Sequence, residues 1–463
     1  MKRIISTILL FVLLCSLFTG CGAQTEEPTV PAPIQMDTPA PESVDVPENT
    51  GPEGNLKLIK AQDALWDNTT ANESGLYKCR IDHNGVSLLY YEYASMTLNF
   101  LMEGADANAD SYTANVPGHE GGTIPAVCGD HLYVISVGTT PIQDFEGYPS
   151  KVFQFGLDGS NRKELALPDE MRVNRNSGVA GDGHGLYLML QALDFSTRSF
   201  GDLILFYIDE DMSEAKEITR FPKEGLFSVD IYGATGNELV LRIASLQEGY
   251  EDAETLEKMK HLDYSWIRLN PETLEQTEFL HYKTGDISIA YDWGDIMYTC
   301  PIGGTEIRIL HVSEGRDEHL MDVNDILELR ENEQVRLFDP VLDGRFGIVA
   351  YIEEPYESHK YHCDPKTGEL VEMKMYYYED DESKPIAPVA ETEDSFVVLS
   401  GSIWYTEPDT FEGQSFMSDR IEAYLTMMDK SDYWSNTKRL RPFEDHVFPE
   451  DADIKSDRGP QTL

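Results

Sequence analysis

Apolar and polar positions follow a repeating pattern that is clearest between residues 129 and 167. A Gly-Asp turn at 129–130 precedes the apolar run 131–137, and a later run, 152–157, leads into the turn Asp158-Gly159-Ser160-Asn161. Glycine and asparagine tolerate the positive φ angles that tight hairpins need. With 124–128 in front and the more polar run 162–167 behind, the pattern predicts a four-stranded antiparallel meander.

The same unit recurs along the chain at a nearly constant spacing. Each turn cluster is followed by an apolar anchor, and the anchors are Leu76, Leu132, Leu186, Leu239, Ile296, Phe346 and Phe396. Subtracting successive positions gives gaps of 56, 54, 53, 57, 50 and 50 residues. Such a period is typical of propeller blades. We therefore predict an all-β, seven-bladed β-propeller over residues 55–445, with six or eight blades as the alternatives, and a polar C-terminal tail at 446–463.

The first residues predict export and a lipid anchor. Lys2 and Arg3 precede an apolar run, 4–18, that is shorter than the roughly 20 residues needed to span a bilayer. Residues 1–20 are therefore interpreted as a signal peptide. The small residues before Cys21 resemble the bacterial lipobox, which predicts lipidation of Cys21, and two acyl chains suffice for stable anchoring.

Residues 21–54 are predicted to form a disordered tether. The stretch 22–54 contains seven prolines and seven acidic residues, and it has no lysine, arginine or aromatic residue. Such a composition cannot bury a core. At about 3.1 Å per residue in the polyproline II conformation, the tether can hold the propeller up to ~100 Å from the anchor.

The net charge of the chain limits which molecules the protein is expected to bind. The chain has 36 Lys and Arg against 83 Asp and Glu, a net charge of −47. A field of this sign repels nucleic acid and anionic lipid. We expect no nucleic-acid partner, contact with the membrane through the lipid alone, and a monomer held at the outer leaflet of the cell membrane.

Motifs of catalysis and cofactor binding are absent from the sequence. It has no nucleophile elbow, zinc-protease motif, phosphate loop or dinucleotide fingerprint. Asp106, Asn108 and Asp110 copy the first ligand positions of a calcium loop, but Ser111 replaces its glycine and Pro117 its bidentate glutamate. We expect an acidic loop and no cofactor, with weak Ca²⁺ binding at these three residues as the alternative.

Histidine and cysteine residues are interpreted as structural. In a strand, His359 and Cys363 share one face and His362 points to the other, so they do not complete a metal site. Cys79 falls on the second strand of unit one and Cys128 on the first strand of unit two. Buried free thiols are the expectation, and a disulfide between these two cysteines stays open as the alternative.

Two segments interrupt the β pattern. Residues 251–262 and 322–331 place apolar side chains at helical spacing among charged ones, and Asp322 is a candidate N-cap. We predict two short amphipathic helices that pack against the blades.

The turn Leu157-Asp158-Gly159-Ser160-Asn161 and the opening unit at 84–96 carry a family resemblance. The chain resembles lipid-anchored propeller proteins of anaerobic Gram-positive bacteria, whose blades are similar to TolB-type repeats. The resemblance covers most of 57–443. It implies a propeller fold and an extracytoplasmic location, and it implies no activity because these families are largely without an assigned function.

Unequal repeat lengths predict which face binds a ligand. Units two, three, four and seven have long connections between their second and third strands, and unit one has a long connection to the next unit. All of these connections emerge at the same end of the blades. Their aromatic residues form a candidate ligand rim, which consists of Phe145, Tyr148, Phe195, Phe200, Tyr250, Phe411 and Phe416.

The sequence favours a non-catalytic protein that binds a cell-surface glycan or an envelope protein at this rim. One alternative is an enzyme of the lyase or glycosidase type at the propeller axis, which needs a pair of inward-facing carboxylates. Another is a scaffold for an envelope complex. Convergent carboxylates beside a histidine or arginine at the channel mouth favour the enzyme, and an aromatic rim without them favours binding.

Overall fold

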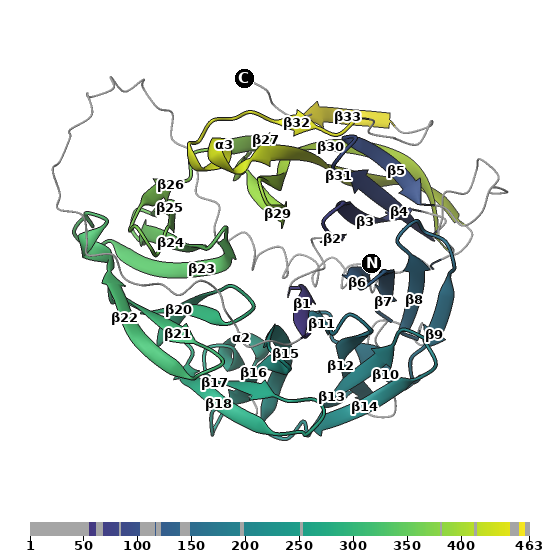
Figure 1. The fold of residues 1–463 in the computed structure, drawn as a ribbon, viewed down its shortest axis with the longest axis horizontal. Coiled ribbons are helices and arrows are strands. Elements are labelled where there is room, and N and C mark those ends of the chain that lie inside the picture. The colour runs from purple at the N-terminus through teal and green to yellow at the C-terminus, as the bar shows by residue number, and fades with distance from the viewer. Residues whose placement is uncertain are drawn as a thin grey trace.

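Seven β-sheets surround a central axis and form a seven-bladed β-propeller (Figure 1). The computed structural model describes residues 55–61, 68–82, 85–101, 116, 122–138, 149–194, 199–250, 253–379, 382–411, 414–444 and 453–458. Each blade is an antiparallel meander whose first strand lies nearest the axis and whose fourth lies outermost. Within the described ranges, none of the helices is long and apolar enough to cross a membrane.

The first four blades follow one another along the chain. Blade 1 consists of β2 (Thr69–Ala71), β3 (Gly75–Asp82), β4 (Gly85–Glu92) and β5 (Thr97–Leu101). Blade 2 consists of β6 (Thr123–Cys128), β7 (His131–Ser136), β8 (Lys151–Gly156) and β9 (Lys163–Ala166). Blade 3 consists of β10 (Met171–Val173) and β11 (Val179–Gly181), which both pair with β12 (Gly185–Asp194), then β13 (Ser199–Asp209) and β14 (Ala215–Phe221). Blade 4 consists of β15 (Leu226–Thr235), β16 (Glu238–Leu246), β17 (Leu262–Leu269) and β18 (Gln276–Lys283).

The last three blades complete the ring. Blade 5 consists of β19 (Ile287–Tyr291), β20 (Ile296–Pro301), β21 (Glu306–His311) and β22 (Arg316–Asp322). Blade 6 consists of β23 (Gln334–Leu342), β24 (Arg345–Ile352), β25 (Glu357–Cys363) and β26 (Leu370–Glu372), and the hairpin β27 (Tyr376–Glu379) and β28 (Glu382–Pro385) follows it. Blade 7 consists of β29 (Ala387–Glu391), β30 (Ser395–Phe411), β31 (Gln414–Asp429) and β32 (Arg441–Pro442). The strand β33 (Asp453–Arg458) pairs with β30 and lies within the segment predicted as a polar tail.

The predicted register of the repeat is confirmed. All seven anchors stand at the first or second position of the second strand of their blade. They are all buried, and the most exposed of them, Ile296, reaches only 8%. The sequence repeat therefore arises because each blade places one buried apolar side chain at the start of its second strand.

The hydrophobic core lies between the blades. Seven clusters of buried side chains each join two adjacent blades, including the cluster of Leu76, Leu425 and Phe443 between blades 7 and 1. Because every blade packs on two neighbours, the ring is held together by seven similar interfaces.

Among the described strands, none is exchanged between blades 7 and 1 where the ring closes. Blades 7 and 1 are each built from consecutive strands, and the backbone joins them through a parallel bridge between Thr97 and Glu444. The additional strand β1 (Lys57–Lys60) instead pairs with β11 and lies near the centre of the ring beside blade 3 (Figure 1).

The connections between strands emerge at two opposite faces of the ring. The turns from first to second and from third to fourth strand share one face, here called the turn face. The loops from second to third strand and the connections between blades share the other, the loop face. The connection from second to third strand is long in blades 2 and 4, and the two strands themselves are lengthened in blades 3 and 7.

Both predicted helices are much shorter than expected. In place of 251–262 the structure has α2 (Thr255–Lys258), because Leu262 already begins β17 and no residue of α2 is buried. In place of 322–331 it has a single 3₁₀ turn, Val323–Asp325. Asp322 caps this turn as predicted, since its side chain accepts a hydrogen bond from the backbone N–H of Asn324 at 2.9 Å.

Candidate functional site

Only part of the candidate ligand rim falls on described residues. Phe145, Tyr148 and Phe195 lie outside them, as do Cys21 and the three residues of the calcium alternative. Phe411 ends β30, and Phe416 lies on β31 opposite Asp409, so both stand in the hairpin that blade 7 extends from the loop face.

The two rim residues with described side chains pack on their own blades. The guanidinium of Arg172 lies 4.6 Å from the ring centroid of Phe200, and burial lowers the pKa of Arg172 to about 10. Tyr250 stacks on His261 with a distance of 3.7 Å between ring centroids. Both residues are half-buried, so each is only partly accessible at the surface.

Exposed apolar side chains occur at two places on the loop face of blade 4. Phe227 at the start of β15 is 38% exposed, and Leu256 and Met259 in the insertion between β16 and β17 are 48% and 43% exposed. We call Phe227, Tyr250, Leu256 and Met259 the blade-4 crest. Three of the six exposed large hydrophobic residues in the described part of the chain thus stand at one end of one blade.

The chain holds the crest in place through backbone and ionic contacts. Gln247 N–H donates to the carbonyl of His261 at 3.0 Å, which closes the insertion at its base. Glu257 pairs with Lys260 at 3.0 Å and with His261 at 3.1 Å. Its hydrogen bonds to Lys260 and then His261 lower the pKa of Glu257. These contacts hold residues 255–261, which carry Leu256 and Met259, against the blade.

A second constellation, close to the axis, is the ion pair of Arg242 and Asp230. The guanidinium of Arg242 lies 3.4 Å from Asp230 Oδ2 and 4.7 Å from the ring centroid of Tyr232. Asp230 also accepts hydrogen bonds from Asn174 at 3.2 Å and from Ser228 at 3.0 Å. Burial raises the pKa of Asp230, and the three polar contacts oppose that rise.

The same constellation continues into blades 5 and 6 through Asp339. The hydroxyl of Tyr232 donates to Asp339 Oδ2 at 3.2 Å, and the backbone N–H of Tyr291 donates to Oδ1 at 2.8 Å. Burial raises the pKa of Asp339 to about 6. First strands of three blades are thereby tied together around the axis.

This arrangement ties neighbouring blades together around the axis. Both oxygens of Asp230 and both oxygens of Asp339 already accept hydrogen bonds from the protein. These hydrogen bonds fix the positions of both carboxylates relative to the first strands of blades 4, 5 and 6. Sequence reasoning missed these residues. The available signal was an arginine inside the apolar run of β16, because a charge in such a run needs a buried partner.

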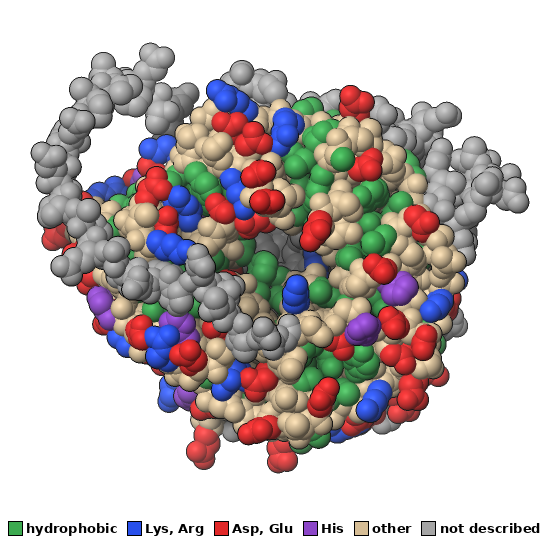
Figure 2. Space-filling model, viewed as in Figure 1, with side chains coloured by type: hydrophobic (Ala, Val, Ile, Leu, Met, Phe, Trp, Pro, Cys, Tyr) green, Lys and Arg blue, Asp and Glu red, His purple; other side chains and the backbone are tan. Residues whose placement is uncertain are grey.

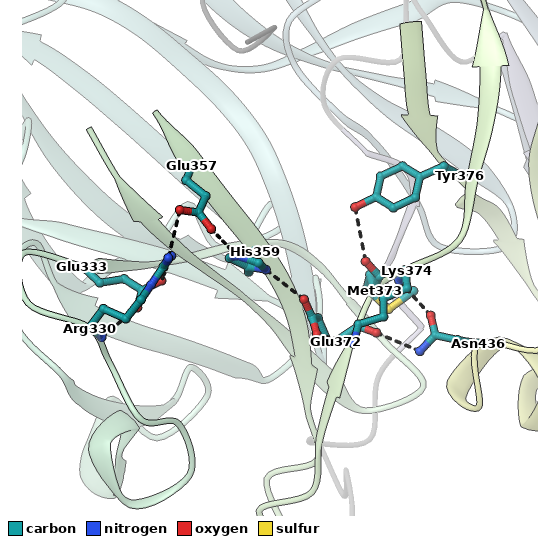
Figure 3. A network of polar contacts seen from close by, with 9 residues as sticks. All are labelled: Arg330, Glu333, Glu357, His359, Glu372, Met373, Lys374, Tyr376 and Asn436. Atoms are coloured by element: carbon teal, nitrogen blue, oxygen red, sulfur yellow. Dashed lines mark hydrogen bonds and ion pairs between the residues drawn. The ribbon is translucent and has the colours of Figure 1, made fainter. Parts of the chain in front are cut away.

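A network of ion pairs connects the outer part of blade 6, as Figure 3 shows. Arg330 pairs with Glu357 at 2.9 Å, and His359 lies 3.1 Å from Glu357 and 2.8 Å from Glu372. Lys374 pairs with Glu372 at 2.6 Å. These side chains are partly exposed and contribute little individually. Hydrogen bonds to Glu357 and then Glu372 raise the pKa of His359.

The remaining histidine and cysteine predictions agree with structural roles. β25 places His362 in a buried position between Phe338 and Trp434, where burial lowers its pKa to about 4. Cys79 and Cys128 are both free and buried, so the alternative of a disulfide between them is not realised. Among the described residues, no group of three or more His, Cys, Asp or Glu could hold a metal ion.

The chain matches no protein-family model and no curated protein. Similar solved structures include an oligogalacturonate lyase from Vibrio parahaemolyticus, with 11% identity, coverage of 78% of this chain and 83% of that one, and a TM-score of 0.39. TolB from Acinetobacter baumannii has 12% identity, coverage of 83% and 79%, and a TM-score of 0.31. An oligogalacturonate lyase in complex with manganese has 13% identity, coverage of 66% and 74%, and a TM-score of 0.36. Likenesses of this size assign neither an activity nor a ligand to this propeller.

Proposed function

We propose that this protein is an extracytoplasmic, lipid-anchored propeller that binds an envelope protein or a surface glycan through its loop face and performs no chemistry on it. The observation that carries the proposal is the blade-4 crest. Several exposed large apolar side chains at one end of one blade are a feature of interaction sites when they form a contiguous patch.

The path of the N-terminal segment is compatible with a binding site on the loop face. Asn55 N–H donates to the side chain of Asn237 at 3.4 Å, and Leu56 N–H donates to the carbonyl of Gly236 at 3.2 Å. Both acceptors belong to the first turn of blade 4, so the chain enters the ring at the turn face. With the proposed anchor at Cys21, the tether joins the propeller on the turn face and leaves the loop face free of it.

The hydrogen bonding of Asp230 and Asp339 supports a binding role over an enzymatic one. The enzyme alternative requires a pair of carboxylates open to substrate. Asp230 and Asp339, two carboxylates close to the axis, are instead bonded to side chains and backbone of blades 3 to 5.

The test compares ligand binding by the wild type with that of two variants. Ligands are first identified with the wild type on a glycan array and by affinity capture from envelope extracts. The crest variant carries Phe227→Ser, Leu256→Ser and Met259→Ser. The control carries Leu274→Ser, which removes a 47% exposed leucine from the turn face.

We expect the crest variant to bind the identified ligand at least about tenfold more weakly, since apolar contacts at an interface centre often contribute 1 kcal/mol or more each. The control should bind like the wild type. Unchanged binding by a folded crest variant, or loss of binding in the control alone, would refute the proposal.

A further inference from the structure

Arg172 on β10 is a half-buried cation on the loop face of blade 3. β10 pairs with the end of β12 that reaches the loop face, where Arg172 stands opposite Gln191. The guanidinium lies 4.6 Å from the ring centroid of Phe200, and its Nη2 donates to Gln191 Oε1 at 3.4 Å. Its Nε is buried and finds no hydrogen-bond partner in the described part of the chain.

The charge of Arg172 is not balanced by a carboxylate. Neither Arg172 nor the nearby Arg175 forms an ion pair with any residue that the structure describes. Burial and then the positive charge of Arg175 lower the pKa of Arg172 to about 10, so the side chain is still charged at neutral pH. A buried charge without a partner is costly. Acidic partners are nevertheless abundant, since the chain has 83 Asp and Glu, and acidic side chains are spread over the face in view in Figure 2.

Other half-buried arginines show what balances a stacked guanidinium elsewhere in the ring. The guanidinium of Arg345 lies 5.0 Å from the ring centroid of Trp434, and its Nη2 lies 2.8 Å from Glu369. The same combination of ring and carboxylate occurs twice more, at Arg162 with Phe153 and Glu164 and at Arg242 with Tyr232 and Asp230. Arg172 has the ring but not the carboxylate.

We propose that Arg172, assisted by Arg175, binds a carboxylate of a partner protein on the loop face of blade 3. The partner's carboxylate takes the place that acidic side chains of this chain take beside the other stacked arginines. A planar guanidinium held on a ring presents its N–H groups in a fixed plane, which suits a carboxylate. The inference rests on the proposed loop-face function and deepens it, since it gives the partner an acidic segment.

The surroundings of Arg172 favour a protein over an acidic glycan as the source of the carboxylate. Phe227 and Met259 of the blade-4 crest are exposed at the loop face of the next blade. Arginine, methionine and aromatic residues are enriched in the cores of protein interfaces. A polysaccharide with a carboxylate on every sugar would be repelled by a chain of net charge −47. A single carboxylate among apolar residues avoids most of that repulsion.

The test measures binding of the whole mature protein to an immobilised peptide, Gly-Ala-Leu-Glu-Leu-Ala-Gly, by biolayer interferometry. The site variant carries Arg172→Gln and Arg175→Gln. The control carries Arg336→Gln and Lys216→Gln, which remove the same charge from exposed positions. Arg336 is a matched residue because it also stacks on a ring, that of Tyr351 at 4.9 Å. Circular dichroism and thermal unfolding establish that the variants are folded.

We expect the site variant to bind the peptide about tenfold more weakly, because a hydrogen bond to a charged group contributes about 1.5 kcal/mol or more. The control should change by less than about twofold. Arg172→Lys keeps the charge and the stem but loses the planar fork, so it should bind at least about threefold more weakly. Raising the salt concentration should weaken binding to the wild type.

Four outcomes would overturn the assignment. The first is no measurable binding of the glutamate peptide to the wild type. The second is a glutamine peptide that binds as well as the glutamate peptide, which would show that the carboxylate is not recognised. Equal losses in the site and control variants would show a general field effect. A uronate disaccharide that binds through Arg172 more tightly than the peptide would assign the site to a glycan.

The two loop-face proposals fail separately. If the crest variant loses the ligand identified with the wild type while the site variant binds the peptide normally, the inference about Arg172 is wrong and the loop-face function stands. If the site variant loses the peptide while the crest variant keeps the identified ligand, the carboxylate site stands and the crest is not the contact surface.

Discussion

Replacing Leu239 by alanine tests whether the core lies between the blades. Leu239 is fully buried on β16 and packs with Leu269 and with the side chains of blade 3. Removing a buried leucine side chain forfeits its transfer free energy and leaves a cavity, which together cost about 2–5 kcal/mol. The matched control is Leu256→Ala, since Leu256 belongs to the same blade but is 48% exposed. It should change the free energy of unfolding by less than about 0.5 kcal/mol.

Urea unfolding followed by circular dichroism measures both variants. The midpoint should fall for Leu239→Ala while the slope with denaturant stays constant, because the surface exposed on unfolding is nearly the same. A loss below about 1 kcal/mol for Leu239→Ala, or an equal loss for Leu256→Ala, would refute the assignment of the core to the interfaces between blades.

Three further predictions concern titrating groups and the anchor. Burial raises the pKa of Asp339 to about 6, so the folded state binds this proton more tightly than the unfolded state, whose pKa is about 4. Stability therefore rises as the pH falls from about 6 toward 4, and Asp339→Asn should remove about 2 kcal/mol of that rise in urea unfolding at pH 7 and pH 4.5. The raised pKa of His359 means that protonation of this side chain stabilises the folded state. This contribution to the free energy of unfolding is complete below about pH 6.5 and is lost as the pH rises through the pKa of His359 in the folded protein. His359→Gln should therefore lower the free energy of unfolding by under about 1 kcal/mol at pH 6 and leave it unchanged at about pH 8.5. Cys21→Ala should release the protein from membranes washed in high salt, and its retention in the membrane fraction would contradict the lipid anchor.

The fold was predictable because one physical requirement recurs in every unit. Each second strand begins with a buried apolar residue next to a tight turn, as at Leu132 and Phe396, and that combination repeats with the length of a blade. The unequal unit lengths correctly predicted long loops in blades 2 and 4, but in blades 3 and 7 the added residues lengthen the second and third strands instead of the loop between them. Because the repeat depends only on residues that are close together in the sequence, it can be recognised without knowing which distant residues are in contact.

Features that depend on distant contacts were not predictable. β1 pairs with β11, and nothing in its four residues indicates that partner. Tyr232 and Asp339 are 107 residues apart and meet only because blades 4 and 6 approach the same axis. The segment at 251–262 has helical spacing, but without a surface to cover Leu256 and Met259 most of it does not form a helix.

The claim that the loop face contacts the partner is tested most directly by photo-crosslinking in cells. A benzophenone amino acid, which inserts into the C–H bonds of proteins and glycans alike, replaces Leu256 on the crest in one strain and Leu274 on the turn face in another. These two leucines have similar exposure, 48% and 47%. The account predicts a discrete adduct from position 256 and none from position 274. An adduct from position 274 alone, or the same adducts from both positions, would contradict it.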